Sequence, residues 1–429
     1  MSRRNFVASL VCFTCVLLFF YLEQLRGAKA VEFTKTWSTD FKNKPEIIKF
    51  NDEYLAVVVH KNLINLTSID GVQKYACKFS IPPNRTVGLL SHPMVLGNGK
   101  LVVHVWAMDS NWIPGSKDLI GIWDLFIIFD PHDCSSTMTI EKDTDSMRYE
   151  LQQVIPYHDK FDLFYREHTN RRVPSGRTSL GPRRFNDKGK RIAMIGYLLG
   201  PEHAMVDMKI GSLKPNDASE GYFLANLSGD QKTMLLRYLD SNFREPREIK
   251  VLPRLSAFSF DESDVKDSLC YSQFEKVPNN QDSAQREKRW VLKCDFFDRK
   301  YPDQQTTVKL SDQPESHFDK SRFSVSILPD DSRVVLLEFK VSHLNESYNY
   351  EYYLQRVYNN GTTADERLLV ATYTNDRAGQ MRLVSLGEAE VCVIFMNNLE
   401  TSYNVMLSIL ASLSDDVTNV KGKCIKMFS

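Results

Sequence analysis

The amino-acid sequence predicts an all-β protein, and three features of it carry that prediction. Aromatic residues, which favour strands, are abundant: the chain of 429 residues has 25 Phe and 18 Tyr. Short apolar or alternating runs recur along the chain, as in proteins built from short strands. Polar turn residues separate these runs, and stretches rich in Ala are few. Together these features indicate sheets rather than helices.

Four regions of the chain share one local pattern, in which a weaker strand leads through a tight turn into a stronger strand. They are Glu46–Val59, Pro93–Trp106, Phe323–Phe339 and Arg382–Phe395. The turns are expected at Asn51–Glu53, Gly97–Gly99, Pro329–Ser332 and Gly387–Ala389. In three of the regions another apolar run follows, so the pattern is that of an antiparallel meander.

Repetition of this meander predicts a β-propeller of about seven four-stranded blades. Copies begin near Pro45, His92, Arg322 and Arg382, and weaker ones near Glu150, near Arg191 and within Tyr222–Ala257. A ring of meanders buries faces that a single meander leaves exposed. The alternative is two β-sandwich domains linked through Leu180–Arg191 or Pro278–Lys288, although the immunoglobulin-type Cys…Trp…Cys spacing is absent.

The segment Ser116–Asp124 resembles the end of a WD repeat, in which Asp and Trp pack inside a blade. The pattern does not recur, and no Gly-His pair precedes it at the expected distance. The resemblance therefore implies a strand with Trp123 facing the core and no membership of that family.

The first thirty residues, Met1–Ala30, have the features of a secretory signal peptide. Arg3 and Arg4 precede an uncharged, mostly apolar run, Phe6–Leu22, and the small-x-small pattern of a signal-peptidase site ends at Ala30. We expect cleavage after Ala30 and a single propeller domain over 31–429. The alternative is a retained signal anchor and a type II membrane protein, because the apolar run is near the lower limit for a spanning helix.

Cysteine usage fits an oxidising compartment. Two of the eight Cys, Cys12 and Cys15, lie in the leader, and the even number that remains predicts three disulfides. Spacing does not fix the connectivity, but pairing of sequence neighbours would give Cys77–Cys134, Cys270–Cys294 and Cys392–Cys424.

Five sequons predict N-glycosylation, which is also typical of secreted chains. The acceptors are Asn65, Asn84, Asn226, Asn345 and Asn360. Asn360-Gly361 has turn chemistry and is expected at a loop tip. Asn65 lies in a strand-like run and is the least expected acceptor.

A basic segment lies within an expected long exposed loop at 168–191. Its cations are Arg171, Arg172, Arg177, Arg183, Arg184, Lys188, Lys190 and Arg191, against the single acid Asp187. Arg171, Arg172, Arg183 and Arg184 are the favoured contacts for an anionic partner, because guanidinium groups bind sulfate and carboxylate in bidentate fashion. A solvated insertion without a ligand is the alternative.

A second exposed loop is expected at 278–289. It ends in Arg286-Glu287-Lys288-Arg289, which resembles the Arg-x-Lys-Arg cleavage site of furin-like convertases. Cleavage after Arg289 would leave the two parts joined if Cys270 pairs with Cys294. An ordinary charged loop is the alternative.

No catalytic signature is present: the chain lacks a Gly-x-Ser-x-Gly elbow, a phosphate-binding Gly loop, a His-Glu-x-x-His site and sialidase Asp boxes. The pairs His132-Asp133 and His158-Asp159 are expected in turns, and His104 in the core. Paired carboxylates for glycoside chemistry could come only from separate strands, for example from Asp118, Asp124, Asp130 and Glu338. No metal or cofactor is expected.

Lys plus Arg and Asp plus Glu both number 54, so the composition gives no reason to expect a nucleic-acid or membrane-surface partner. We therefore expect a secreted, glycosylated binding protein that engages an extracellular protein or anionic glycan through loops at the rim of the propeller. The alternatives are a carbohydrate-active propeller hydrolase or lyase and a structural secreted component.

Overall fold

The computed structural model describes twenty-one segments of the chain. They are 33–42, 45–51, 53–60, 62–109, 122–141, 149–168, 178–194, 208–213, 221–227, 233–241, 247–253, 257–261, 266–278, 286–298, 304–314, 318–342, 348–364, 367–374, 379–386, 390–397 and 417–427. The leader predicted for residues 1–30 lies outside these segments. No helix in the described part of the chain is long and apolar enough to cross a membrane.

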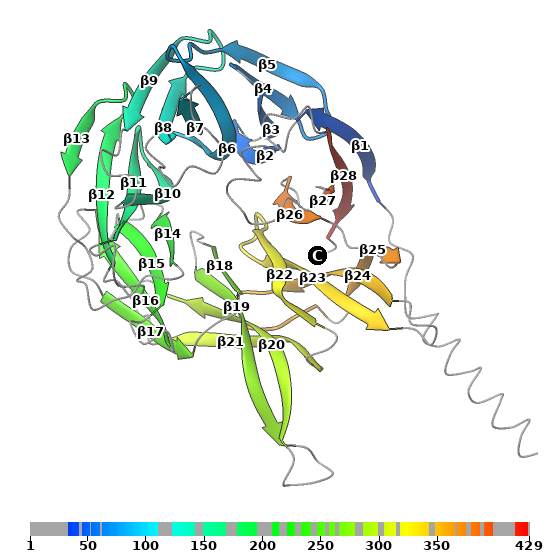
Figure 1. The fold of residues 1–429 in the computed structure, drawn as a ribbon. Coiled ribbons are helices and arrows are strands. Elements are labelled where there is room, and N and C mark those ends of the chain that lie inside the picture. The colour runs from blue at the N-terminus through cyan, green and yellow to red at the C-terminus, as the bar shows by residue number, and fades with distance from the viewer. Residues whose placement is uncertain are drawn as a thin grey trace, which may run out of the picture.

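The described strands form seven four-stranded antiparallel sheets arranged in a ring around a central axis (Figure 1). Each sheet is a blade; in blades 1 to 6 the first strand lies nearest the axis, and in blade 7 the inner strand is β26. Blade 1 contains β2 (Glu46–Phe50), β3 (Glu53–His60), β4 (Leu63–Ser68) and β5 (Gln73–Lys78). Blade 2 contains β6 (Arg85–Val95), β7 (Leu101–Asp109), β8 (Ile122–Phe129) and β9 (Ser136–Glu141). Blade 3 contains β10 (Tyr149–Tyr157), β11 (Lys160–His168), β12 (Thr178–Asn186) and β13 (Arg191–Met194).

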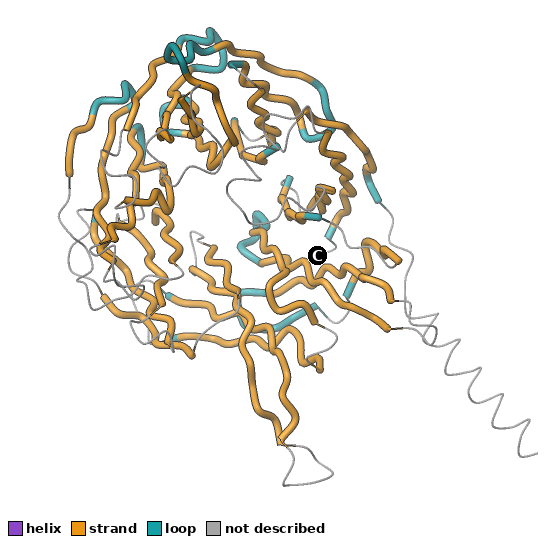
Figure 2. Tube along the Cα trace, viewed as in Figure 1, coloured by secondary structure: helices purple, strands orange, loops and turns teal. Residues whose placement is uncertain are grey.

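The other blades continue the ring in chain order. Blade 4 contains β14 (Met208–Leu213), β15 (Gly221–Leu227), β16 (Thr233–Asp240) and β17 (Arg247–Pro253). Blade 5 contains β18 (Ala257–Asp261), β19 (Asp267–Pro278), β20 (Arg286–Phe297) and β21 (Gln305–Pro314). Blade 6 contains β22 (Phe318–Ile327), β23 (Arg333–Ser342), β24 (Tyr348–Val357) and β25 (Leu368–Thr374). Among the described residues, strands and turns account for the whole fold (Figure 2).

Blade 7 closes the ring by pairing the two ends of the chain. It combines β26 (Gln380–Ser385), β27 (Glu390–Asn397) and β28 (Val417–Lys426) with the N-terminal β1 (Lys35–Lys42), in the order β1-β28-β27-β26. Trp37 of β1 lies opposite Gly422 of β28, and a Cβ on Gly422 would come within 2.1 Å of the indole. A glycine at this position therefore allows the Trp37 ring to lie directly against the backbone of β28, where β1 closes the ring.

Central strands are apolar on both faces because each blade packs between two others. In β7, Leu101, Val103 and Val105 belong to the core shared with blade 1, whereas Val102 belongs to the core shared with blade 3. All four side chains are completely buried. This double burial explains why the strongest apolar runs in the sequence follow the tight turns.

These observations confirm the propeller prediction and exclude the pair of sandwiches, whose proposed linkers contain strands of blades 3 and 5. The turns expected at Asn51, at Gly97–Gly99 and at Pro329–Ser332 are present, whereas 387–389 lies outside the described segments. The repeat expected to begin near Arg191 is wrong, since Arg191–Met194 is the outer strand of blade 3 and blade 4 begins at Met208.

All three disulfides expected from sequence neighbours are present. Cys77–Cys134 joins blade 1 to the β8–β9 turn of blade 2, Cys270–Cys294 crosses from β19 to β20, and Cys392–Cys424 crosses from β27 to β28. The last bridge fixes β28, the strand on which β1 closes the ring.

The long loop expected at 168–191 is wrong over its described part. β11 continues to His168, and β12 occupies Thr178–Asn186, where it pairs with both β11 and β13. Phe185 is buried and its ring stacks on that of Phe161 at a centroid distance of 5.3 Å. Pairing on both edges and this one aromatic anchor stabilise a strand that shows no apolar alternation in the sequence.

The loop expected at 278–289 is wrong at its C-terminal end. β20 begins at Arg286, so the whole Arg286–Arg289 motif lies in a strand, and the backbone at Arg289 is in register with Glu275 on one side and Pro314 on the other. The β19–β20 hairpin extends outward from the ring (Figure 1). Cleavage after Arg289 stays a prediction, and it would require local opening of this paired backbone.

Candidate functional site

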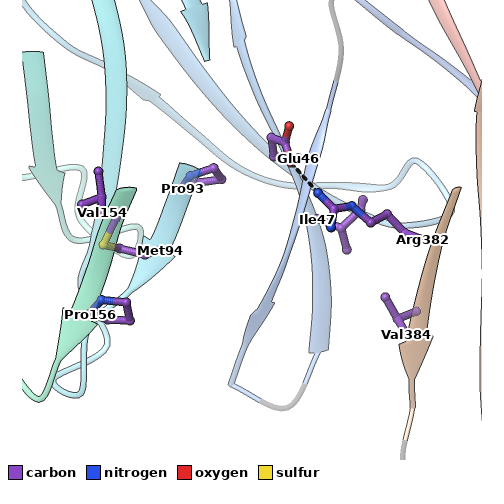
Figure 3. A pocket seen from close by; sticks show the side chains of 8 residues that line it. All are labelled: Glu46, Ile47, Pro93, Met94, Val154, Pro156, Arg382 and Val384. Carbon is purple, nitrogen blue, oxygen red and sulfur yellow. Dashed lines mark ion pairs between the residues drawn. The ribbon is translucent and has the colours of Figure 1, made fainter. Parts of the chain in front are cut away.

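A cavity of about 310 Å³ lies against the innermost strands of four blades. Its lining comes from β2, β6, β10 and β26, which belong to blades 1, 2, 3 and 7. The lining residues are Glu46, Ile47, Pro93, Met94, Val154, Pro156, Arg382 and Val384. Figure 3 shows Pro93, Met94, Val154 and Pro156 on one side and the other four residues facing them.

The cavity combines an apolar wall with one charged pair. Arg382 Nη2 lies 3.7 Å from Glu46 Oε2, and the two side chains are 55% and 22% exposed. Met94, Val154 and Val384 are buried. Among the described residues, no group of three or more His, Cys, Asp or Glu is placed to hold a metal ion.

The basic segment contributes a second candidate site, the turn between β12 and β13, which we call the basic turn (Asn186–Arg191). Asn186 Oδ1 accepts hydrogen bonds from the backbone N–H of Lys188 at 3.1 Å and of Lys190 at 2.8 Å. Gly189 supplies the left-handed residue, with φ 72°. Lys188, Lys190 and Arg191 are exposed. The turn therefore displays three cations on a backbone held by its own hydrogen bonds.

Asp187 attaches the basic turn to blade 2. It receives a salt bridge from Lys100 Nζ at 2.8 Å and a hydrogen bond from Asn98 Nδ2 at 3.1 Å. The hydrogen bond from Lys100 lowers the pKa of Asp187 below its ordinary value, despite partial burial. The one acid of the segment is thus paired with Lys100 of blade 2, although it also attracts the neighbouring Lys188.

Arg184 is not an exposed contact residue, contrary to the sequence-based expectation. It donates to both carboxylate oxygens of Asp162, at 2.8 and 3.1 Å, and to the Tyr222 hydroxyl at 2.7 Å. Its guanidinium lies 4.5 Å from the centroid of the Tyr157 ring. Burial disfavours the charged form, but Asp162 and Tyr222 together outweigh this effect and raise the pKa of Arg184. Arg184 therefore joins blade 3 to blade 4.

The remaining cations of the segment fall into two groups. Arg183 is half-buried in β12. Arg171, Arg172 and Arg177 lie outside the described residues. The prediction of an anionic partner therefore rests, in the described part of the chain, on Lys188, Lys190 and Arg191.

The sequons occupy different environments. Asn84, with φ 62°, and Asn360 are exposed in turns, and Asn360 Oδ1 accepts hydrogen bonds from the Thr362 N–H at 3.0 Å and the Thr362 hydroxyl at 2.7 Å. Asn65 is half-buried in β4, and Asn226 lies in β15 between partners in β14 and β16. Asn345 lies outside the described residues.

The residues considered for catalysis do not gather at the cavity. His104 is buried, as expected, with Nε2 2.7 Å from Asp124 Oδ1 and its ring stacked on Phe126. His132 and His158 lie in turns, also as expected. Glu338 is buried in β23, 3.3 Å from Arg322 Nε. None of these residues lines the cavity.

Three residues from the sequence analysis remain, and they differ in how far the structure describes them. Asp118 lies outside the described residues. Trp123 lies in a strand, as expected, because β8 begins at Ile122. The direction of its side chain lies outside the description. Asp130 lies at the end of β8 and accepts a hydrogen bond from the backbone N–H of His132 at 2.9 Å.

No protein-family model and no curated protein matches the chain. Solved structures with a similar fold include the β-propeller domain of the Trilobed protease from Pyrococcus furiosus, with a TM-score of 0.38, 11% identity, and 73% of this chain and 78% of that one covered. Trypanosoma rangeli sialidase matches with a TM-score of 0.40 and 11% identity over 89% and 60%. The WD40 domain of SCAP from fission yeast matches with 0.40 and 8% identity over 92% and 98%. We take no function from these similarities.

Sequence reasoning missed Glu46 and Arg382, the charged pair of the cavity, and Asp162 and Tyr222, the partners of Arg184. Each pair joins strands that are far apart in the chain, so spacing gives no signal for it. A signal was available for Asp162, which stands between the apolar residues Phe161 and Leu163 in the sequence and would need a partner if buried with them.

Proposed function

We propose that this chain is a secreted, N-glycosylated binding protein whose basic turn contacts an anionic extracellular partner. One observation carries the proposal: the basic turn displays Lys188, Lys190 and Arg191 while Asp187 is engaged with Lys100. A preordered set of cations loses little conformational entropy on binding an acidic surface. Sulfated glycan and acidic protein share the chemistry that such a turn would recognise.

Two further features support the extracellular setting. The three disulfides suggest an oxidising environment. Asn84 and Asn360 are exposed in turns, as glycosylated asparagines of secreted proteins generally are. Secretion after cleavage at Ala30, without membrane insertion of the mature chain, belongs to the same proposal.

The proposal is tested by measuring retention of the secreted protein on immobilised heparin and on an acidic peptide surface. A variant with Lys188→Gln, Lys190→Gln and Arg191→Gln should bind its anionic surface roughly tenfold more weakly, because each exposed cation contributes up to about 1 kcal/mol. The loss should shrink as salt is added, since exposed charges are screened.

A matched control replaces three exposed lysines outside the basic turn, with Lys78→Gln, Lys421→Gln and Lys426→Gln. It removes the same net charge and should retain wild-type binding. Equal losses in both triple variants would show that only net charge matters and would refute the basic turn as contact. Failure of the wild-type protein to bind either surface would refute an anionic partner.

Glycosylation is tested by intact mass before and after enzymatic deglycosylation. Asn84→Gln and Asn360→Gln should each remove one glycan mass, whereas Asn65→Gln should leave the mass unchanged apart from the substitution. The mass of the deglycosylated chain also reports whether it begins at Val31. A chain that carries no glycan and retains its leader would contradict this part of the proposal.

A further inference from the structure

The basic turn contacts the β6–β7 turn of blade 2 (Leu96–Lys100). Asp187 of the basic turn receives the salt bridge from Lys100 Nζ at 2.8 Å and the hydrogen bond from Asn98 Nδ2 at 3.1 Å. These contacts hold turns of two neighbouring blades together. Cations from blade 2 and from blade 3 therefore lie on one surface.

A third turn, between β10 and β11 of blade 3 (Tyr157–Lys160), adjoins both of the others. The backbone N–H of Gly97 donates a hydrogen bond to the His158 carbonyl, which joins this turn to the β6–β7 turn. Lys160 lies opposite Asn186 in the register of β11 and β12, so it stands beside the first residue of the basic turn. We call the three turns together the basic rim.

Positive charge exceeds negative charge on the basic rim. Its acids are Asp159 and Asp187, and its cations are Lys100, Lys160, Lys188, Lys190 and Arg191. The three cations of the basic turn are exposed, and the other two are partly exposed. Because these cations lie on three turns, one small anion cannot contact all of them. A ligand that carries several anionic groups along its length can do so.

The side chains of the basic rim fit a sulfated glycan better than an acidic protein surface. Protein interfaces are centred on aromatic or apolar side chains and contain few lysines. Among the cations of the rim only Arg191 is not a lysine, and none of the described large apolar side chains that are exposed lies in the rim. Ile192, which follows the basic turn, is 47% exposed. A protein partner is expected to cover Ile192, whereas a glycan has no need of it.

We propose that the basic rim binds a sulfated glycan chain that lies across blades 2 and 3. This inference rests on the proposed function and narrows it to one partner class, with Lys160 as a contact outside the basic turn. Each cation attracts a sulfate, and binding releases counterions that are condensed on the charged chain. Because the sulfates are linked, a contact at one turn raises the effective concentration of sulfate at the next turn.

Isothermal titration calorimetry with a heparin octasaccharide, at several salt concentrations, tests the extent of the rim. Lys160→Gln should weaken binding about twofold and reduce the slope of log affinity against log salt by about one, as loss of one ionic contact does for a charged nucleic-acid chain. Lys160→Arg keeps the charge and should restore both values. Circular dichroism establishes that each variant is folded.

The matched control is Lys421→Gln, which removes an exposed lysine of β28 in blade 7, outside both the basic turn and the basic rim. It should change neither the affinity nor the salt dependence. An equal effect of Lys160→Gln and Lys421→Gln, or no effect of Lys160→Gln, would overturn the rim as the contact surface.

Two other ligands and one variant decide the class of partner. An acidic peptide of equal charge with a central Leu should bind more weakly than the octasaccharide, and Ile192→Gln should leave octasaccharide binding unchanged. Tighter binding of the peptide, or weaker octasaccharide binding by Ile192→Gln, would overturn the glycan in favour of an acidic protein. Inorganic sulfate at matched ionic strength should not displace the octasaccharide, and displacement would indicate a site for single anions.

The outcomes distinguish failure of this inference from failure of the proposed function. If the triple variant of the basic turn loses octasaccharide binding and Lys160→Gln does not, the basic turn is the contact and the wider rim is refuted. If the wild-type protein binds neither the octasaccharide nor the acidic peptide, both proposals are refuted.

Discussion

Two interfaces between neighbouring blades, called seams below, are stabilised by different interactions. The seam between blades 1 and 2 is covalent and mostly apolar: it contains the Cys77–Cys134 disulfide and a shared core that includes Val57 and Val103. The seam between blades 3 and 4 contains a buried ionic cluster of Asp162, Arg184 and Tyr222. The ring therefore joins its repeats with two solutions of very different sensitivity to substitution.

In the first seam, the described contacts next to the disulfide are between rings and apolar side chains, so each of them is tolerant of substitution. Tyr75 of β5 meets the His132 ring edge-on at 5.5 Å, and Phe50 lies 6.2 Å from the same ring. His132 is exposed in the β8–β9 turn next to Cys134. Loss of one such contact leaves other apolar contacts in place.

In the second seam, Asp162, Arg184 and Tyr222 are hydrogen-bonded to one another, so each of them compensates the burial of the other two. Asp162 is completely buried and accepts hydrogen bonds from Arg184 and from the Tyr222 hydroxyl. Burial together with the neighbouring carboxylate raises the pKa of Tyr222 far above its ordinary value, so its proton stays in place. Removing one member leaves an uncompensated buried group, which costs more than the contact itself contributes.

The largest expected effect is that of Asp162→Ala. The substitution leaves the Arg184 guanidinium without its carboxylate, and the free energy of unfolding should fall by about 3–5 kcal/mol. Urea denaturation followed by tryptophan fluorescence measures the change.

The matched control is the double variant Asp162→Leu with Arg184→Met. It removes both charges and fills the space with apolar groups, so it should be less destabilised than Asp162→Ala alone. A double variant as unstable as the single one would mean that lost packing, and not an unpaired charge, determines the cost at this seam.

The disulfide seam should respond less. With Cys77→Ser and Cys134→Ser together, the free energy of unfolding should fall by about 2–4 kcal/mol, because the unfolded chain gains the freedom of the opened loop. The folded protein should keep the His132–Tyr75 contact, which the chemical shift of the His132 ring protons reports. Loss of that contact in the folded variant would show that the bridge positions blade 2 and does not act mainly on the unfolded chain.

The two seams also differ in how far the sequence predicts them. An even cysteine count predicts that Cys77 and Cys134 are each in a disulfide, because the residue type has one main role in an oxidising environment, and pairing of sequence neighbours gives the correct partner although spacing does not fix it. An arginine such as Arg184 can bind a ligand, lie in solvent or form a buried ion pair. Because Arg183 and Lys188 are its neighbours, the sequence pattern predicts a solvated loop. Its true role depends on Asp162 and on Tyr222 of the next blade, which only the ring brings together.

The same reasoning separates the fold from the cavity. Turn chemistry such as Gly97–Gly99 and strong runs such as Leu101–Val105 are local, so they predict blades directly. The pairing of Glu46 with Arg382 joins the first and last blades and depends on ring closure through β1 and β28. A charged pair between the first and last blades therefore escapes a single-sequence prediction.

The smallest expected effect belongs to the seam between blades 2 and 3, where Lys100 and Asp187 form a partly exposed pair. Asp187→Asn should lower the free energy of unfolding by less than about 1 kcal/mol at neutral pH, since a surface ion pair contributes little. The pKa of Asp187 is lower in the folded than in the unfolded protein because of the Lys100 hydrogen bond. Its stabilising contribution is therefore complete above the unfolded pKa of about 3.9 and is lost as the pH falls through the lower folded value.

Denaturation of the wild-type protein and of Asp187→Asn at a series of pH values checks this sign. The difference in unfolding free energy should be constant from neutral pH down to about pH 5 and should vanish in stronger acid. Added salt at neutral pH should reduce it, because exposed charges are screened, whereas the cost of Asp162→Ala should be insensitive to salt. A salt-sensitive Asp162→Ala variant would place that carboxylate in contact with solvent and would remove the distinction between the buried and the exposed seam.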